Sequence, residues 1–231
     1  MSQTASLFSH FVSTRGTFRW LSALVIVSGA FAWVVVGFDI AEIRRIDRQL
    51  MGMPVSADER AAYAFVSEVV IKMQITLLWL TGIAFVTWLY RARANLRAFG
   101  TRHLRFPRNW TVFGFVIPVL NLIRPYQVVR EVWQASDPDA THPTAWMSVK
   151  PPLLVKLWWG TFVGFVGLKL LAWWMYRNGL HDPARVGIAE LVELVADLMA
   201  AVSVSLVFFV IEGITVSQQL KWQRLDPPLP D

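Results

Sequence analysis

Four long apolar stretches dominate the pattern of hydrophobic and polar positions along the chain. They lie at about 20–38, 61–90, 153–176 and 186–216, and the first reads WLSALVIVSGAFAWVVVGF. Their apolar residues form continuous blocks rather than periodic stripes, which is typical of membrane spans. About 20 helical residues cross a hydrocarbon core, and lipid offers no partner to an unpaired backbone amide. The pattern predicts an all-α integral membrane four-helix bundle, with residues 1–231 as a single transmembrane domain.

A further apolar stretch, WTVFGFVIPVLNLI, lies between the second and third spans. It is too short to cross a membrane, and Pro118 interrupts its helical hydrogen bonding. From Tyr126 to Ala135 an amphipathic pattern follows, in which Val128, Val129 and Val132 can face lipid while Gln127, Arg130 and Glu131 face water. We expect a re-entrant or interfacial helical element over about 110–135 on the cytoplasmic side. The sequence leaves open whether 110–123 is re-entrant, interfacial or spanning.

The orientation of the spans follows from the connection after the second one. This connection holds no acidic residue and many arginines: Arg91, Arg93, Arg97, Arg102, Arg105 and Arg108. Since cytoplasmic loops gather Lys and Arg, we expect this connection and both termini to be cytoplasmic, and Asp39 to Arg60 to lie outside. The closing RLDPPLPD at 224–231 is predicted to be a flexible tail.

Composition agrees with this interpretation and narrows the chemistry. The 231 residues are 55% hydrophobic and only 16% charged, against about 25% charged in soluble domains. No cysteine is present, which excludes disulfides, thiolate metal sites and iron–sulfur clusters. The net charge of +6 is interpreted as the excess of Lys and Arg that membrane proteins carry in their cytoplasmic loops. We do not expect the protein to bind nucleic acid.

Two sequence elements resemble a known family. The first comprises Trp88, Arg91, Ala92, Asn95, Leu96, Ala98 and Gly100; the second comprises Pro118, Asn121, Leu122, Pro125, Tyr126 and Gln127. Together with the closing ITVSQQ, they resemble bacterial membrane proteins of domain-of-unknown-function family 4328. The resemblance implies a polytopic bacterial membrane protein, and it implies no reaction. We expect this protein to lie in the bacterial inner membrane.

The first candidate site is a polar junction on the cytoplasmic side. Its members are polar residues beside apolar backbone: Arg91, Asn95, Asn121, Arg124, Gln127 and Glu131. In one interpretation they form a pocket for an anionic headgroup or phosphate, which arginine binds with paired hydrogen bonds. In the other they are structural, with arginine paired to Glu131 or Glu212, and we favour this one. The remaining arginines, Arg93 among them, are interpreted as topology determinants and lipid-phosphate contacts.

The second candidate site is a cluster of ionisable residues within the spans, in the outer half of the membrane. Its members are Glu68, Lys72, Lys169, Glu190, Glu193 and Asp197. The last three share one face of the fourth helix. Charges inside a membrane usually face protein or water and have a partner. Three interpretations stay open: ion-paired packing, which we favour, a proton or cation relay, and a carboxylate metal site.

Three glycines on one face of the third span, Gly160, Gly164 and Gly167, predict close helix packing. This packing is expected within the chain rather than between copies.

The leading functional hypothesis is a non-enzymatic accessory, scaffolding or regulatory membrane subunit. Its expected partners are the lipid bilayer, anionic lipid headgroups and other proteins or a second copy of the chain. A small proton- or cation-coupled transporter and a membrane enzyme acting on a lipid-soluble substrate are the alternatives. No catalytic residue, metal ligand set or cofactor is predicted, because all four histidines lie in loops or tails and no phosphate-binding Gly-rich loop is present.

Overall fold

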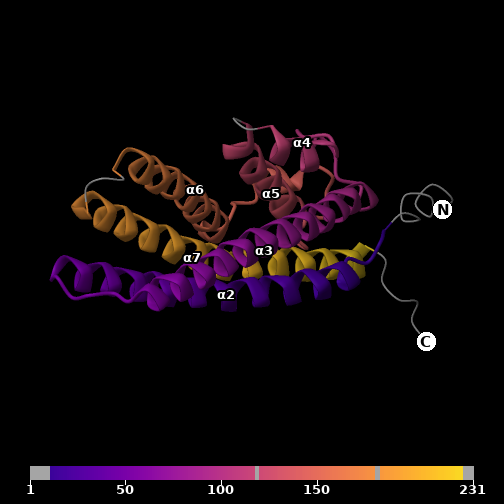
Figure 1. The fold of residues 1–231 in the computed structure, drawn as a ribbon. Helices are drawn as coiled ribbons and strands as arrows, with labels where there is room; N and C mark the ends of the chain where they lie inside the picture. Colours follow the sequence, from indigo (N-terminus) through magenta and orange to yellow (C-terminus); the bar gives the residue numbers. More distant parts are fainter. Residues whose placement is uncertain (1–10, 118–119, 180–182, 226–231) are drawn as a thin grey trace. The chain divides into compact units, whose positions relative to one another are not determined.

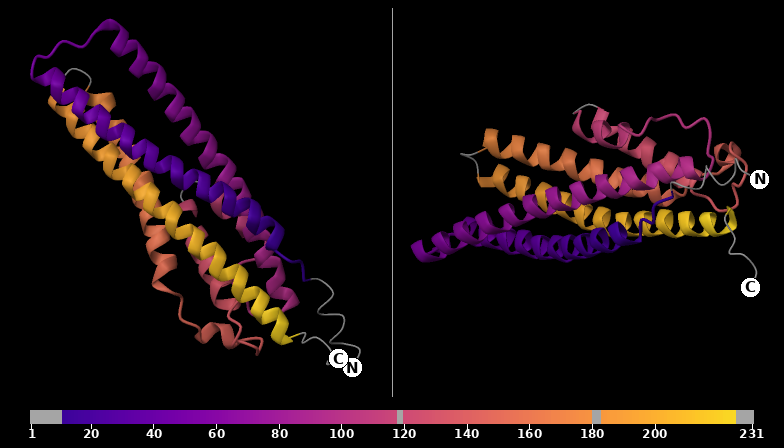
Figure 2. Two further views of the ribbon diagram at one scale, coloured as in Figure 1. Left: turned by 90° about the horizontal axis from the view of Figure 1, so that it is seen from below. Right: turned by 90° about the vertical axis from the view of Figure 1, so that its right-hand side faces the viewer.

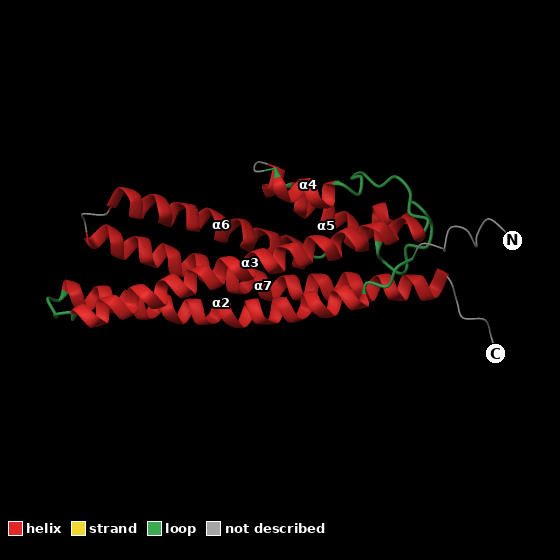
Figure 3. Cartoon of the chain, turned by 45° about the vertical axis from the view of Figure 1, so that its right-hand side comes forward, coloured by secondary structure: helices red, strands yellow, loops and turns green. Residues whose placement is uncertain are grey.

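The structure is a computed structural model that describes residues 11–117, 120–179 and 183–225. All regular elements in these ranges are helices (Figure 3). Four are long: α2 (Arg15–Leu50), α3 (Ala57–Ala98), α6 (Leu153–Gly179) and α7 (Pro183–Leu225). The short elements are α4 (Trp110–Val116), η2 (Leu120–Leu122), α5 (Arg124–Ala135) and η3 (Ala145–Ser148) (Figure 1). The predicted all-α class is confirmed.

The four long helices are long and apolar enough to cross a membrane. Only 6% of the most apolar stretch of α3 is buried within the chain, and Leu78, Trp79 and Ile83 are among its exposed side chains. A soluble monomer rarely leaves so large an apolar surface uncovered, whereas lipid covers it without loss of free energy. The exposed apolar faces therefore fit a membrane environment.

The helices extend well beyond the predicted spans. With 42 residues, α3 is about 63 Å long, roughly twice the thickness of a hydrocarbon core. The segment from Asp39 to Arg60, expected to be a connection, is mostly helical because α2 continues to Leu50 and α3 begins at Ala57. The turn between them contains Gly52 at a φ of +75°, a conformation that glycine adopts readily. Hydrophobic blocks thus marked the spans but not the ends of their helices.

The predicted element at 110–135 is a set of short helices. The seven residues of α4 rise only about 10 Å, which is too little to span a membrane. The helix ends just before Pro118, which itself lies outside the described residues. Of the tail predicted at 224–231, only the end of α7 at Leu225 is described.

The chain packs as two compact units, and α2, α3, α6 and α7 contribute residues to both. Unit 1 comprises the described parts of Met1–Ala23, Thr81–Leu157 and Leu206–Asp231. Unit 2 comprises Leu24–Leu80 and Trp158–Ser205.

Unit 1 is organised around the buried end of α3. Trp88 is fully buried and donates its indole N–H to the Thr215 hydroxyl at 3.2 Å. The helix then ends in a Schellman turn, in which Gly100 takes a φ of +69° and the Thr101 amide bonds to the Leu96 carbonyl at 3.1 Å. This turn directs the arginine-rich connection toward α4 and α5.

In unit 2, α6 and α7 lie side by side (Figures 1 and 2). A Cβ atom at Gly164 would lie 2.5 Å from the Met199 methyl carbon, so the helices approach closely at this glycine. The packing expected within the chain is found there. It is absent at Gly160 and Gly167, where a Cβ atom would meet no atom within 4 Å.

Candidate functional site

The helix α5 carries three of the six residues of the predicted polar junction. Pro125 stands in its first turn, where its fixed φ suits the start of a helix. Val128, Val129 and Val132 are completely buried against the protein. Their expected exposure to lipid is therefore wrong: the amphipathic stripe of α5 faces the core of unit 1. Its opposite face presents Arg130 to the surface.

Glu131 of α5 is also buried, with only 3% of its surface exposed, although the sequence placed it toward water. One carboxylate oxygen accepts a hydrogen bond of 2.7 Å from the Arg105 amide, and the other lies 3.5 Å from the Phe106 amide. The Arg93 guanidinium pairs with the same carboxylate at 3.4 Å and donates to the Phe106 carbonyl. Glu131 thus fixes the connection between α3 and α4 from inside unit 1.

Burial raises the pKa of the Glu131 carboxyl above its ordinary value. The hydrogen bond from the Arg105 amide and the charge of Arg93 lower this pKa, and they offset only part of the effect of burial.

A cavity of about 440 Å³ opens beside this buried pair. We call it the arginine cavity; it is lined by Arg105, Phe106, Arg124, Gln127, Arg130, Glu131, Gln134, Trp146 and Met147. The Arg124 guanidinium donates to Gln127 Oε1 at 2.9 Å and lies 5.4 Å from the centre of the Phe106 ring. Among the described residues neither Arg124 nor Arg130 forms an ion pair. The cavity is therefore cationic and suited to hold an anion.

Asn95 lies apart from the arginine cavity, in a network of buried side-chain amides. Its Oδ1 accepts from the Val12 amide at 3.1 Å, and its Nδ2 donates to Gln218 Oε1 at 3.2 Å. Gln218 Nε2 donates in turn to the Ala92 carbonyl at 2.8 Å and to Ser136 Oγ at 3.1 Å. These bonds join the N-terminal segment, α3, α5 and α7 within unit 1, which is the structural role considered for Asn95.

The other two predicted junction residues contribute to neither arrangement. Arg91 is exposed on α3 and does not line the arginine cavity. Asn121 is half-buried in η2, where its amide bonds to the Ile117 carbonyl at 2.8 Å. The structure therefore brings Arg124, Gln127 and Glu131 together and leaves the remaining junction residues elsewhere.

The second candidate site lies in unit 2, where α6 and α7 meet α3. Lys169 Nζ bonds to Glu193 Oε1 at 2.7 Å and to Asp197 Oδ2 at 2.6 Å. Gln74 of α3 donates to Asp197 Oδ1 at 2.8 Å. Asp197 is 1% exposed, so this ion pair is sheltered inside the bundle. We call Gln74, Lys169, Glu193 and Asp197 the carboxylate cluster.

Three of the predicted ionisable residues lie outside this cluster. Glu68 and Lys72 form an ion pair of 2.6 Å on the exposed surface of α3. Glu190 lies near Tyr176 and interacts through charge with Glu42 and Arg45 of α2.

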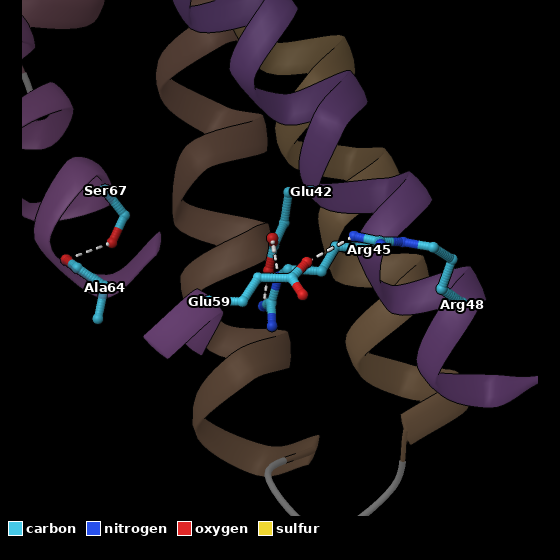
Figure 4. A network of polar contacts seen from close by, with 6 residues as sticks. All are labelled: Glu42, Arg45, Arg48, Glu59, Ala64 and Ser67. Atoms are coloured by element: carbon cyan, nitrogen blue, oxygen red, sulfur yellow. Dashed lines mark hydrogen bonds and ion pairs between the residues drawn. The ribbon is translucent and has the colours of Figure 1, made fainter. Parts of the chain in front are cut away.

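The neighbouring ion pairs of α2 are shown in Figure 4. Glu42 pairs with Arg45 one turn further along α2, and Arg48 bonds to Glu59 at the start of α3 at 2.8 Å. The Arg45 guanidinium also lies 4.3 Å from the centre of the Tyr63 ring. All four residues of these ion pairs lie in the segment from Asp39 to Arg60 that was expected to be an external connection.

The sequence did not identify several residues of these two sites. Arg93 was interpreted as a lipid contact, yet it is buried and paired with Glu131. Gln74 stands inside the second apolar stretch, and Gln218 lies just beyond the end of the fourth. Both are uncharged, and the available signal was that an amide side chain needs hydrogen-bond partners where it is buried. Within the described ranges, no group of three or more His, Asp and Glu side chains is placed to hold a metal ion.

These observations define an all-α membrane protein with four helices able to span the bilayer and two polar centres inside its packing units. The chain belongs to the family described as domain of unknown function (DUF4328), whose model matches residues 53–215. No curated protein and no solved structure matches the chain.

Proposed function

We propose that the protein is a non-enzymatic accessory or regulatory subunit of the bacterial inner membrane that binds the phosphate group of an anionic lipid in the arginine cavity. The observation that supports this proposal is the pair of arginines, Arg124 and Arg130, that line the cavity without an ion-pair partner among the described residues. Both chain termini and the arginine-rich connection are placed on the cytoplasmic side in this proposal.

The chemistry of the cavity favours a phosphate over other anions. A guanidinium presents paired N–H groups that match the oxygens of a phosphate. Arg124 is already oriented by Gln127 and by the rings of Phe106 and Trp110, at 5.4 and 5.2 Å, so little side-chain freedom is lost on binding. Glu131 does not neutralise these arginines, because its oxygens are engaged by Arg93 and by backbone amides.

An anionic lipid is the favoured source of this phosphate. The apolar exposed surface of the long helices fits a bilayer, and lipid headgroups are present there at high local concentration. A lipid held at α5 would stabilise the surface that a partner subunit contacts.

Lipid retention in a mild detergent tests the proposal. The wild-type protein is purified with added phosphatidylglycerol or phosphatidylcholine, and bound lipid is counted by native mass spectrometry. We expect Arg124→Gln and Arg130→Gln to reduce bound phosphatidylglycerol roughly tenfold, since a charge-assisted hydrogen bond contributes about 1.5–3 kcal/mol. Arg91→Gln, an exposed arginine outside the cavity, is the control. Equal retention by all variants would refute the proposal.

A small proton-coupled transporter is the second candidate, supported by the sheltered Lys169–Asp197 pair. It requires that Asp197→Asn abolish a pH-dependent flux in proteoliposomes. The accessory role requires instead that Asp197→Asn leave the contacts with a partner subunit unchanged. It also requires that Arg124→Ala disrupt these contacts.

A further inference from the structure

Asp39 is a buried carboxyl group that the ion pairs of unit 2 leave unsatisfied. It belongs to α2, beyond the end of the predicted first span, and was expected to lie in an external connection. Only 7% of its surface is exposed, and its Oδ2 receives no hydrogen bond. A buried acceptor without a donor is rare in proteins and calls for an explanation.

The charged group that acts most strongly on Asp39 is a second carboxyl group, that of Asp197. Asp39 lies within hydrogen-bonding range of Asp197, and it also interacts through charge with Lys169 and Glu193. Both oxygens of Asp197 already accept hydrogen bonds, one from Gln74 and the other from Lys169. Among the described residues, neither Gln74 nor Lys169 donates to Asp39 Oδ2.

Two ionised carboxylates at this separation repel each other, and neither can donate a hydrogen bond to the other. A single proton removes both difficulties, because a carboxylic acid donates its O–H to the neighbouring carboxylate. The charge balance points the same way: Lys169 is one cation facing the three acids Asp39, Glu193 and Asp197. A proton on the Asp39 carboxyl group lowers the excess of negative charge.

We propose that Asp39 and Asp197 form a carboxyl pair that binds one exchangeable proton, with Asp39 as the acid that donates to Asp197. The groups that face this pair are Gln74 from α3, Lys169 from α6 and Glu193 from α7. Within the described ranges no group of three or more acids is placed to hold a metal ion, which leaves a proton as the ligand of this pair. This site goes beyond the proposed lipid binding, since it lies in the other unit and uses none of its residues.

Infrared spectroscopy of the whole protein in lipid tests the proposal directly. A protonated aspartate gives a carboxylic-acid C=O band that an ionised carboxylate lacks. In wild-type protein labelled with carbon-13 aspartate, this band should be shifted by the label, and it should shift again on exchange into heavy water. The band should disappear as the pH is raised. An absence of any aspartic-acid band at pH values where exposed aspartates are ionised would overturn the proposal without the use of a variant.

Variants then assign the proton to the pair. Asp39→Asn keeps the shape and can still donate to Asp197, so we expect a folded protein in which the band is lost. Asp197→Asn should shift the band, because the acceptor changes from carboxylate to amide. Glu68→Gln, an exposed acid on α3, should leave the band unchanged. A labelled aspartic-acid band that survives unchanged in both aspartate variants would contradict the proposal.

Discussion

Asn95 of α3 donates a hydrogen bond of 3.2 Å to Gln218 of α7, and both side chains are 1% exposed. Because Gln218 also donates to Ala92 and Ser136, one amide of α7 satisfies polar groups of α3 and of the C-terminal end of α5. Buried side-chain amides of this kind fix one packing arrangement, since any shift leaves a polar group without a partner.

We therefore expect Gln218→Leu to destabilise the protein by about 1–3 kcal/mol, the usual effect of leaving buried polar groups unsatisfied. Thermal unfolding in detergent measures this change as a lower midpoint. Gln219→Leu is the matched control, because Gln219 is adjacent in sequence and its side chain bonds, among the described residues, only to the exposed Arg15. A midpoint that falls equally in both variants would show that the buried network has no special role.

The buried pair of Arg93 and Glu131 predicts a strong contrast between two neighbouring arginines. Removing one partner of a buried ion pair typically costs about 3–5 kcal/mol, because the other charge stays buried alone. Arg93→Met should cause a loss of this size, whereas Arg91→Met, at an exposed position, should change stability by no more than about 0.5 kcal/mol. Chemical unfolding of the two variants in mixed micelles compares them, and similar losses would disprove the assignment.

The raised pKa of Glu131 predicts a pH dependence of stability with a definite sign. The folded chain holds this proton more tightly than the unfolded chain does. The contribution is therefore complete below the ordinary pKa of 4.5 and falls as the pH rises from there through the raised pKa. Thermal midpoints measured in this window should decrease in the wild type.

Glu131→Gln should remove this component of the pH dependence, because the substituted side chain does not titrate. The exposed carboxyl of Asp139, which is 84% exposed, provides the comparison: Asp139→Asn should keep the wild-type slope. A wild-type slope retained by the Glu131 variant would count against the assignment.

The close approach of α5 to α7 predicts an effect of a single methyl group. A Cβ atom at Gly213 would overlap Trp133 Cη2, so Gly213→Ala forces the indole out of place. Such overpacking typically destabilises by about 1–3 kcal/mol, and Trp133→Leu in the same variant should restore part of the loss. Gly187 also lies in α7, but a Cβ atom added there would meet no atom within 4 Å. Gly187→Ala should therefore not lower the unfolding temperature.

The four spans and the helical class were predictable from sequence because lipid imposes a simple requirement. A chain in hydrocarbon must cover its backbone with a long apolar helix, and such helices appear as continuous blocks of hydrophobic letters. The stripe of α5 was also visible, but periodicity shows only which residues share a face. It did not show that Val128 and Val132 face protein rather than lipid.

The two polar centres could be listed only in part, because their partners are distant in sequence. Glu131 and Arg124 were identified, yet the partner of Glu131 is Arg93, which is 38 positions away and indistinguishable by sequence from its neighbouring arginines. Asp39 was assigned to a connection, since the end of a hydrophobic block gives no sign that the helix continues.

The sequence alone determined that four helices are long and apolar enough to cross a membrane, because hydrophobicity is a property of each residue and adds up along a helix. Tertiary structure alone decided which charges are paired, which are exposed and which acid lacks a donor. These properties depend on distances between helices, and the free energy of a buried charge depends on the groups that surround it rather than on its position in the chain.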